Sequence, residues 1–401
     1  MFSDDKNNVE KTLNNLSAAG FFISTQQQMI NPVIGLYANE VLQVQPALVG
    51  YIFTFFSFSS LLIKLGSYFI VKWRRIVYPL FVSGLLISVL APLGYVLARN
   101  YALLLALRIV HGAAFAFDTV LMLTIAGHRS DGTSLLKAIQ RYTTFLAVGL
   151  TTGPIIGTFT VSLLGVGNTI MLSSLMGVGA FFTGFKTAKT VLADNSVIDT
   201  EKTGGKTASQ LKDRVLAITS FGYLSYNISY GGVLAFSPLI ARRELGFSES
   251  LVTIMFLIYY MSALLARASL SRLLKRLKAE TIYEVILLAS AIGVVFIALL
   301  RDPFIFASGY VLMAMAHGLS FPLSSLIVAQ HFKNDQVRLT ANSVLMSMWD
   351  TGMMLGPLIC SVFLSFLPLN QVLVPLVMFP LAGCLIMALT PFSIDKESRI
   401  R

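Results

Sequence analysis

Long apolar runs alternate with short polar breaks over nearly the whole chain. Twelve of these runs are long enough to cross a hydrocarbon core of about 30 Å as helices. They lie at 15–38, 47–70, 76–98, 101–127, 138–164, 167–185, 214–241, 250–274, 281–300, 303–330, 340–367 and 371–392. The first run is the weakest, because "STQQQMIN" (24–31) interrupts it, and a membrane tolerates such a stretch only beside a polar cavity or a protein partner. The pattern predicts an all-α integral membrane protein with twelve transmembrane helices.

The composition supports a membrane protein and argues against a large soluble one. Of the 401 residues, 55% are hydrophobic and 12% are charged, whereas soluble domains carry about 25% charged residues. The cysteines, Cys360 and Cys384, both lie in apolar runs and suggest neither a disulfide framework nor a metal site. The polar start "MFSDDKNNVEKTLNN" has no basic region leading into a short apolar stretch, so we expect no cleaved signal peptide.

The distribution of basic residues predicts the orientation. With a cytoplasmic N-terminus, the outer loops hold only four of the 30 lysines and arginines, namely Arg99, Arg242, Arg243 and Arg301. Positively charged loops stay on the cytoplasmic side, so we expect a multi-pass protein of the cell membrane with both termini inside. The net charge of +11 then reflects topology, and we expect no nucleic-acid partner.

The longest hydrophilic stretch divides the chain into two halves. Residues 186–214 contain a Gly204-Gly205 pair and mixed charges, which are typical of a flexible linker. We therefore predict a cytoplasmic tail at 1–14, a six-helix half at 15–185, a cytoplasmic linker at 186–214, a second six-helix half at 215–392 and a cytoplasmic tail at 393–401.

The two halves repeat each other in sequence. "VHGAAF" (110–115) recurs as "AHGLSF" (316–321), "GLTTGPII" (149–156) as "GMMLGPLI" (352–359), and "WRR" (73–75) as "LKR" (274–276). The matches occur in the same order and at nearly constant spacing. Parallel repeats of this kind, related by an axis along the membrane normal, predict a substrate site between the halves near the midplane.

Three local patterns resemble those of the major facilitator superfamily. In the fourth run, Leu104, Arg108, His111, Gly112 and Ala116 resemble L-x-x-x-R-x-x-Q-G-x-x-x-A, with histidine in place of glutamine. In the fifth, "GLTTGPIIG" (149–157) resembles G-x-x-x-G-P-x-x-G, which the drug–proton antiporters of that family typically carry. The resemblance extends over essentially the whole chain. It implies two pseudo-symmetric six-helix halves and transport by alternating access.

The third pattern, in the loop after the second run, departs from the family. Gly66, Arg74 and Arg75 fit the ends of G-x-x-x-D-R-x-G-R-R, but Ile70 and Val71 replace the Asp-Arg pair. In the second-half copy, "SRLLKR" (271–276), a serine stands where an acid is expected. The cytoplasmic gate implied by the family would therefore work with fewer ion pairs, or by a different mechanism. Its candidate residues here are Gly66, Arg74, Arg75, Arg272 and Arg276.

The glycine–proline pattern also has a physical interpretation. Gly149 and Gly153 are four residues apart, so both lie on one helix face and permit close approach of a second helix. Pro154 removes a backbone hydrogen bond and bends the helix. We expect these helices either to hinge and seal the interface between the halves, or simply to pack through small residues. The residues concerned are Gly149, Gly153, Pro154, Gly157, Gly352, Gly356 and Pro357.

A polar stripe runs along the fourth helix. Arg108, His111 and Asp118 project within an arc of about 80°. A charge that faces lipid at the midplane costs several kcal/mol, so we expect the stripe residues to face a wet cavity or each other. Asp118 is a candidate proton carrier with His111 as a relay, and Asp350 is the rival acid. A fixed buried hydrogen-bond network is the alternative. The proton-coupling candidates are Arg108, His111, Asp118 and Asp350.

Polar groups within other helices are candidates for substrate binding. In the family, the first, fourth, seventh and tenth helices line the central cavity, and in this chain the same four helices are the richest in mid-helix polar groups. By this resemblance the candidates are Gln27, Gln28, Asn31, Tyr226, Asn227, Tyr230, His317 and Ser320.

These features favour a secondary transporter over an enzyme. The chain has no H-E-x-x-H, no phosphate-binding loop and no metal-ligand spacing, so we expect no catalytic residue, cofactor or metal. We predict proton-coupled efflux of apolar or cationic compounds. Uptake of a neutral or acidic nutrient with protons and a non-transporting membrane sensor are the alternatives. The expected partners are the lipid bilayer, a small-molecule substrate and protons, and we expect a monomer.

Overall fold

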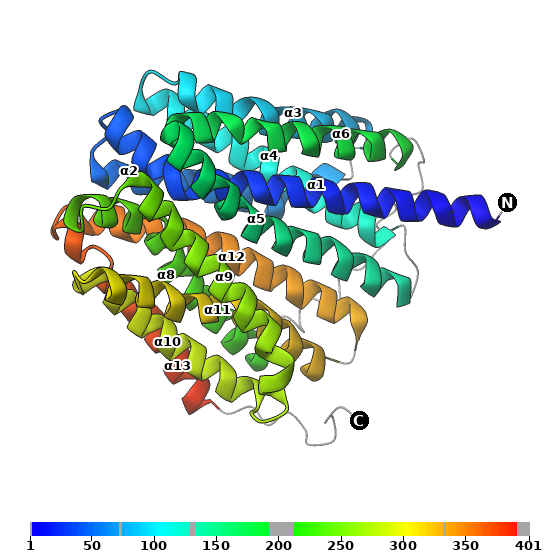
Figure 1. Cartoon of the computed structure of the whole chain (residues 1–401). Helices are drawn as coiled ribbons and strands as arrows, with labels where there is room; N and C mark the ends of the chain where they lie inside the picture. Colours follow the sequence, from blue (N-terminus) through cyan, green and yellow to red (C-terminus); the bar gives the residue numbers. More distant parts are fainter. Residues whose placement is uncertain (1, 72–73, 129–132, 192–211, 333, 391–401) are drawn as a thin grey trace. The chain divides into compact units, whose positions relative to one another are not determined.

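The computed structural model describes residues 2–71, 74–128, 133–191, 212–332 and 334–390, and this part of the chain is helical without β-strands. The first half consists of α1 (Phe2–Leu36), α2 (Pro46–Val71), α3 (Arg74–Leu97), α4 (Tyr101–His128), α5 (Thr133–Leu172) and α6 (Ser174–Val191). The second half consists of α8 (Arg214–Glu244), α9 (Glu249–Leu274), α10 (Ala279–Leu299), α11 (Pro303–His331), α12 (Asp335–Phe363) and α13 (Met378–Leu389) (Figure 1). Helices occupy most of every predicted apolar run, and the predicted all-α membrane fold is confirmed.

Hydropathy separates the helices into two kinds. Among the described residues, eight helical stretches are long and apolar enough to cross a membrane, with α5 and α6 joined in one stretch, Arg141–Thr187. The helices α1, α8 and α12 are not among these stretches. The case of α8 shows why a more polar helix is tolerated: from Leu216 to Ala241 nearly every residue is buried. Protein, and not lipid, therefore surrounds its polar groups.

Several helix ends differ from the predicted ones. The first helix begins at Phe2, within the predicted tail, because no glycine or proline precedes Gly20 to end it. Gly165, with φ 80° and ψ 173°, breaks α5 between the fifth and sixth predicted runs. The helix α6 continues to Val191, and residues 192–211 of the predicted linker lie outside the described residues.

The last predicted run, 371–392, is only partly α-helical. It starts as 3₁₀ turns at Leu369–Gln371 and Val374–Val377, and regular α-helix begins at Met378. Pro375 lies in the second of these turns, where its missing N–H cannot contribute to a regular hydrogen-bond ladder.

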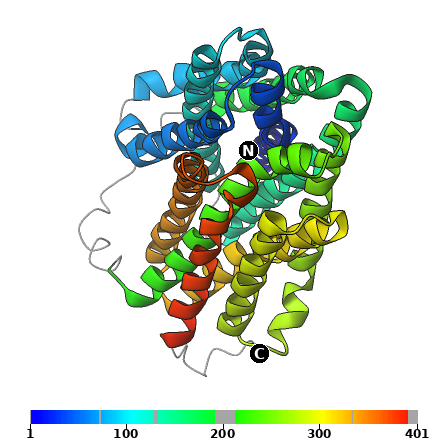
Figure 2. The same cartoon turned by 90° about the vertical axis from the view of Figure 1, so that its left-hand side faces the viewer.

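The two halves pack their helices in the same pairs. In the first half α1 lies along α5 and α3 lies along α4, and in the second half α8 lies along α12 and α10 along α11. The last helix, α13, runs beside α8 (Figure 2). The repeats recognised in the sequence are thus repeats of structure.

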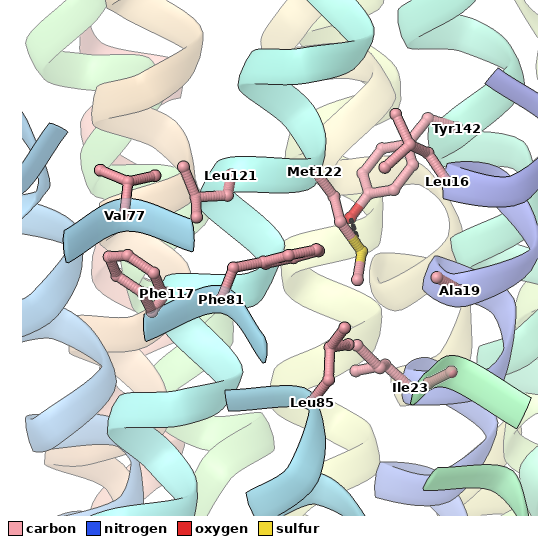
Figure 3. Packing of buried hydrophobic residues seen from close by; sticks show 11 residues of the cluster. Leu16, Ala19, Ile23, Val77, Phe81, Leu85, Phe117, Leu121, Met122 and Tyr142 are labelled. Carbon is pink, nitrogen blue, oxygen red and sulfur yellow. Dashed lines mark hydrogen bonds between the residues drawn. The ribbon is translucent and has the colours of Figure 1, made fainter. Parts of the chain in front are cut away.

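An apolar cluster holds the first half together (Figure 3). It joins α1, α3, α4, α5 and α6 through fully or almost fully buried side chains, and a smaller cluster joins α8, α11 and α12 in the second half. The members of the first cluster are Leu16, Ala19, Ile23, Val77, Phe81, Leu85, Phe117, Leu121, Met122, Tyr142 and Ala180.

The chain divides into two compact units, each composed of discontinuous segments. The first unit comprises Met1–Gln45, Phe55–Thr200 and Ser248–Leu257, and the second comprises Pro46–Thr54, Glu201–Phe247 and Ile258–Arg401. The start of α2 thus groups with the second unit, where the Thr54 hydroxyl donates to the carbonyl of Met354 at 3.1 Å.

Candidate functional site

The glycine–proline patterns pack against the first helix of their own half. A Cβ added at Gly149 would lie 2.5 Å from the carbonyl oxygen of Phe21 in α1, and one at Gly153 would lie 2.6 Å from the carbonyl oxygen of Thr25. In the second half, Gly352 lies against Asn227 and Gly356 against the carbonyl of Ile228, both in α8. The small residues therefore allow α1 to touch α5, and α8 to touch α12, at backbone distance.

Arg108 is buried within the first half. Its guanidinium carbon lies 4.2 Å from the ring centroid of Phe56 in α2 and 5.7 Å from that of Tyr95 in α3. The side chain is only 1% exposed, and its guanidinium also donates a hydrogen bond to the Tyr95 hydroxyl oxygen. The aromatic faces attract the buried cation, and they separate it from any ligand in this arrangement.

His111, one helical turn further along α4, has both ring nitrogens engaged. Its Nδ1 lies 2.7 Å from the Tyr95 hydroxyl and its Nε2 lies 3.1 Å from the amide nitrogen of Gln27 in α1. With that amide as donor, Nε2 accepts and Nδ1 carries the proton. The imidazole is fully buried. Arg108, Tyr95, His111 and Gln27 thus form one hydrogen-bonded chain across α1, α3 and α4.

Asp118 has a different environment, although it lies on the same helix. It is fully buried, and neither carboxyl oxygen has a hydrogen-bond partner among the described residues. On the α3 side it faces the backbone of Gly84, where an added Cβ would collide with the carboxyl group. The neighbouring turns of α4 carry Phe117, Leu121 and Met122 of the apolar cluster (Figure 3). A carboxyl group in such a place is stable only when it is uncharged.

An aromatic cluster surrounds His317 in the second half. We use this name for Tyr226 and Tyr230 of α8, Tyr259 and Tyr260 of α9, His317 of α11 and Trp349 of α12. The ring centroid of His317 lies 4.9 Å from that of Tyr230, 5.1 Å from Tyr259 and 5.5 Å from Tyr260. It lies 5.7 Å from Trp349 and 6.2 Å from Tyr226. Four helices of one unit therefore meet at a single imidazole.

Hydrogen bonds fix the cluster from within. The Tyr226 hydroxyl lies 2.6 Å from that of Tyr259 and 2.9 Å from His317 Nδ1. A second pair joins the hydroxyls of Tyr230 and Tyr260 at 2.6 Å. The four tyrosines are at most 2% exposed, whereas His317 and Trp349 are partly exposed. The accessible surface of the cluster is thus formed by the imidazole and the indole.

Asp350 follows Trp349 in α12 and is buried at 4% exposure. It lies within electrostatic range of Tyr223 in α8, and Arg267 of α9 lies within range of both Tyr223 and His317. The second half therefore places an acid and a base near its aromatic cluster. Asp118 in the first half lies within electrostatic range of Tyr142 of α5.

The remaining predicted binding residues make the following contacts. Asn227 donates to the carbonyl of Tyr223 at 2.7 Å, and the Ser320 hydroxyl bonds to the carbonyl of Ala316 in its own helix. Gln28 packs against Gly153, and Asn31 is partly exposed. The substrate-binding candidates that the structure brings together are Tyr226, Tyr230 and His317.

The predicted gate residues lie at helix ends. Gly66 is in α2, and a Cβ added there would meet nothing within 4 Å. Arg74 and Arg75 start α3, and Arg272 and Arg276, at the end of α9 and just after it, are exposed. For Arg272 and Arg276 no salt bridge appears among the pairs of described residues.

Sequence reasoning missed half of the aromatic cluster. Tyr259, Tyr260 and Trp349 belong to helices that the family resemblance does not assign to the cavity. A signal was present for Trp349, because tryptophan in membrane proteins prefers the interface and this one lies in the middle of a helix. No pattern in the sequence pairs Tyr259 with Tyr226, since that contact between side chains of α8 and α9 forms only in the folded structure.

Solved structures with the same fold are found among transporters. The nucleoside transporter NupG shares 12% identity and a TM-score of 0.75, with 95% of this chain and 100% of NupG covered. A bacterial homologue of the human lysosomal transporter Spinster shares 14% identity and a TM-score of 0.72, covering 95% and 96%. The human organic anion transporter MFSD10 (TETRAN) shares 12% identity and a TM-score of 0.61, covering 96% and 99%.

The sequence comparisons identify the family of the chain. No curated protein matches the chain. A family model described as Major Facilitator Superfamily matches residues 16–357 and 219–398, and thus nearly all of both halves. Together with the paired helical halves, this match shows that the chain belongs to the Major Facilitator Superfamily.

Proposed function

We propose that this membrane transporter is a proton-coupled antiporter that exports apolar or weakly cationic compounds, with Asp118 as the proton carrier. The observation that carries the proposal is the burial of Asp118 without any hydrogen-bond partner among the described residues. An ionised carboxylate there would cost several kcal/mol. A carrier that takes up a proton before the site closes and releases it after opening avoids this cost.

The aromatic cluster supports the substrate class. Its tyrosine, indole and imidazole groups offer flat apolar faces with few polar atoms, which suits apolar compounds. Ring faces also attract cations, but near the cluster the charges of Asp350 and Arg267 oppose each other. The resemblance of Gly149, Gly153, Pro154 and Gly157 to the antiporter pattern agrees with export.

Proton-coupled uptake of a neutral or acidic compound is the second candidate, and Arg267 favours it. This guanidinium lies within electrostatic range of His317 and could pair with a carboxylate. Arg108, the other candidate for such pairing, is enclosed by Phe56 and Tyr95. NupG and MFSD10, named as nucleoside and organic anion transporters, show that the fold also serves such substrates.

Proteoliposomes with an imposed pH gradient distinguish the candidates. Export by antiport predicts that a cationic dye accumulates in vesicles that are acidic inside, because protons that leave the vesicle drive the dye into it. Uptake by symport predicts that an organic acid or a neutral compound accumulates in vesicles that are acidic outside. If dissipating the gradient leaves transport of every substrate unchanged, proton coupling is wrong.

The orientation is part of the proposal and can be tested separately. In a background lacking Cys360 and Cys384, single cysteines at Asn168 and Ser196 should react from opposite sides of the membrane. Asn168 is exposed near the break at Gly165, and Ser196 lies outside the described residues. Labelling of Ser196→Cys by an impermeant reagent on intact cells would reverse the proposed topology.

A further inference from the structure

The aromatic cluster exposes one hydrogen-bonding edge. His317 and Trp349 are partly exposed, and the four tyrosines behind them are buried. The Tyr226 hydroxyl bonds to His317 Nδ1, while Nε2 has no hydrogen-bond partner among the described residues. An unsatisfied ring nitrogen facing hydrocarbon would cost several kcal/mol. The exposed edge of His317 therefore faces a space that water or a ligand can enter.

The tyrosine hydroxyls determine whether the exposed edge of His317 donates or accepts a hydrogen bond. When Tyr226 donates to Nδ1, the imidazole proton resides on Nε2, and the Tyr226 oxygen is free to accept from Tyr259, 2.6 Å away. The chain Tyr259–Tyr226–His317 then presents an N–H donor beside the indole of Trp349. The stacked pair Tyr230–Tyr259, with centroids 5.5 Å apart, holds this layer rigid from behind.

Charge near the edge restricts the ligand further. Arg267 lies within electrostatic range of His317, while Asp350 lies within range of Tyr223, which Arg267 also reaches. The Arg267 guanidinium would repel a cationic ligand at His317. The negative charge of Asp350 would oppose the attraction of Arg267 for an anionic ligand. An uncharged ligand meets neither penalty.

We propose that His317 and Trp349 form a binding site for an uncharged, flat heteroaromatic ring. The ring stacks on the indole and accepts a hydrogen bond from Nε2–H of His317. This inference rests on the proposed transport function and narrows its substrate class, because it selects uncharged aromatic compounds over cations.

Tryptophan fluorescence can report on this site directly. The chain has two tryptophans, so Trp73→Phe leaves Trp349 as the only indole. Caffeine and quinoxaline are suitable probes, since both are flat and uncharged and carry acceptors without donors. We expect either probe to change the Trp349 emission of the detergent-solubilised full chain saturably, without any ion gradient. The pyridinium 1-methylnicotinamide and benzoate serve as flat cationic and anionic comparisons, and we expect weaker binding of both.

Variants locate the site, with affinity measured by equilibrium dialysis of labelled caffeine. His317→Phe keeps the ring surface but removes the donor, and we expect about a tenfold loss of affinity, the effect of about 1.4 kcal/mol. Trp349→Leu should cause a loss at least as large, and Trp349→Phe should restore most of it. The matched control is Tyr283→Phe, which removes another buried hydroxyl, bonded to Ser324 at 2.9 Å outside the cluster. It should change affinity less than twofold.

Each outcome is decisive. No saturable signal with either uncharged probe, or affinities unchanged by both His317→Phe and Trp349→Leu, refutes the site. Tighter binding of the cation or the anion refutes the ligand class. If caffeine binds as expected but no substrate responds to a pH gradient in proteoliposomes, the proposed function fails and the site stands. If transport is coupled to the pH gradient but Trp349→Leu does not change it, the proposed function stands and the binding site is refuted.

Discussion

The two copies of one motif, "VHGAAF" in α4 and "AHGLSF" in α11, have acquired different surroundings. His111 is fully buried with both ring nitrogens bonded. His317 is partly exposed and bonds through Nδ1, and its Nε2 has no partner among the described residues. Two turns further on, α4 carries Asp118, and α11 carries Ser324 at the corresponding position, bonded to Tyr283. The same backbone frame thus holds an ionisable group in one half and a neutral hydroxyl in the other.

This difference suggests a division of labour between the halves. In the first half, the charged groups Arg108 and Asp118 of α4 are enclosed by protein, and Asp118 can change its charge without breaking a hydrogen bond to a described residue. In the second half, the polar atoms belong mostly to tyrosines and an imidazole whose accessible edge suits recognition. We therefore expect changes in α4 to affect coupling, and changes around α11 to affect affinity.

The largest expected effect is loss of coupling in Asp118→Asn. The amide cannot exchange a proton, so accumulation driven by a pH gradient should be abolished in proteoliposomes, while downhill counterflow of the same substrate continues. Asp350→Asn is the matched variant in the second half and should remain coupled. If Asp118→Asn still concentrates substrate and Asp350→Asn does not, proton coupling depends on α12 of the second half and not on α4 of the first.

A second effect concerns the helix contacts that the two halves share. A Cβ at Gly153 would lie 2.6 Å from both the Gln28 Cβ and the Thr25 carbonyl oxygen, and one at Gly356 would lie 2.7 Å from the amide of Gly232. We expect Gly153→Ala and Gly356→Ala each to destabilise the protein by about 1–3 kcal/mol, measured by thermal unfolding in detergent.

Gly157→Ala is the control for these variants. Its Cβ would meet the Met29 Cα at 3.6 Å, an ordinary contact, so its unfolding should match that of wild type. Equal destabilisation at Gly153 and Gly157 would contradict the close-packing explanation. Normal unfolding of Gly153→Ala with abolished turnover would instead favour a hinge at this position.

The fold was predictable because its signals are local. Apolar runs, polar breaks and the repeated motifs are properties of consecutive residues, and even the break at Gly165 falls between two predicted runs. The site was only partly predictable. Polarity within a helix identified Asp118 and His317, whereas Tyr95, Phe56 and Tyr259 are ordinary membrane residues whose roles depend on tertiary contacts. Whether Arg108 faces a ligand or an aromatic ring cannot be read from its own helix.

The third prediction compares the tyrosines that hold the two histidines. Tyr95→Phe leaves His111 Nδ1 buried without a partner, which should cost about 1–3 kcal/mol of stability and leave ligand affinity unchanged. Tyr226→Phe should have a similar cost in stability, but it should also weaken caffeine binding about threefold, because His317 loses the hydroxyl that fixes its tautomer. Equal effects of the two variants on affinity would remove the functional distinction between the histidines.

The smallest expected effect concerns an ion pair near the start of each half. Glu10 and Arg141 lie 3.9 Å apart with exposed side chains, so Glu10→Gln should unfold like wild type. Asp213 instead caps α8 by accepting from the amides of Val215 and Leu216, and it lies 2.9 Å from His331. Burial alone would raise the pKa of Asp213, but the hydrogen bonds from His331 and from these amides outweigh it and lower the pKa.

The sign of the pH dependence follows from that lowered pKa. The folded protein binds the Asp213 proton less readily than the unfolded chain does, so the stabilisation is present above the ordinary pKa of about 3.9 and is lost as the pH falls through the folded value. Asp213→Ala, which also removes the cap, should cost about 1 kcal/mol at neutral pH, and Asp213→Asn, which keeps a capping oxygen, should cost less. The difference between wild type and Asp213→Asn should shrink below about pH 4. Thermal unfolding in detergent across this range would contradict the assignment if the difference grew as the pH fell, or if Glu10→Gln proved as destabilising as Asp213→Ala.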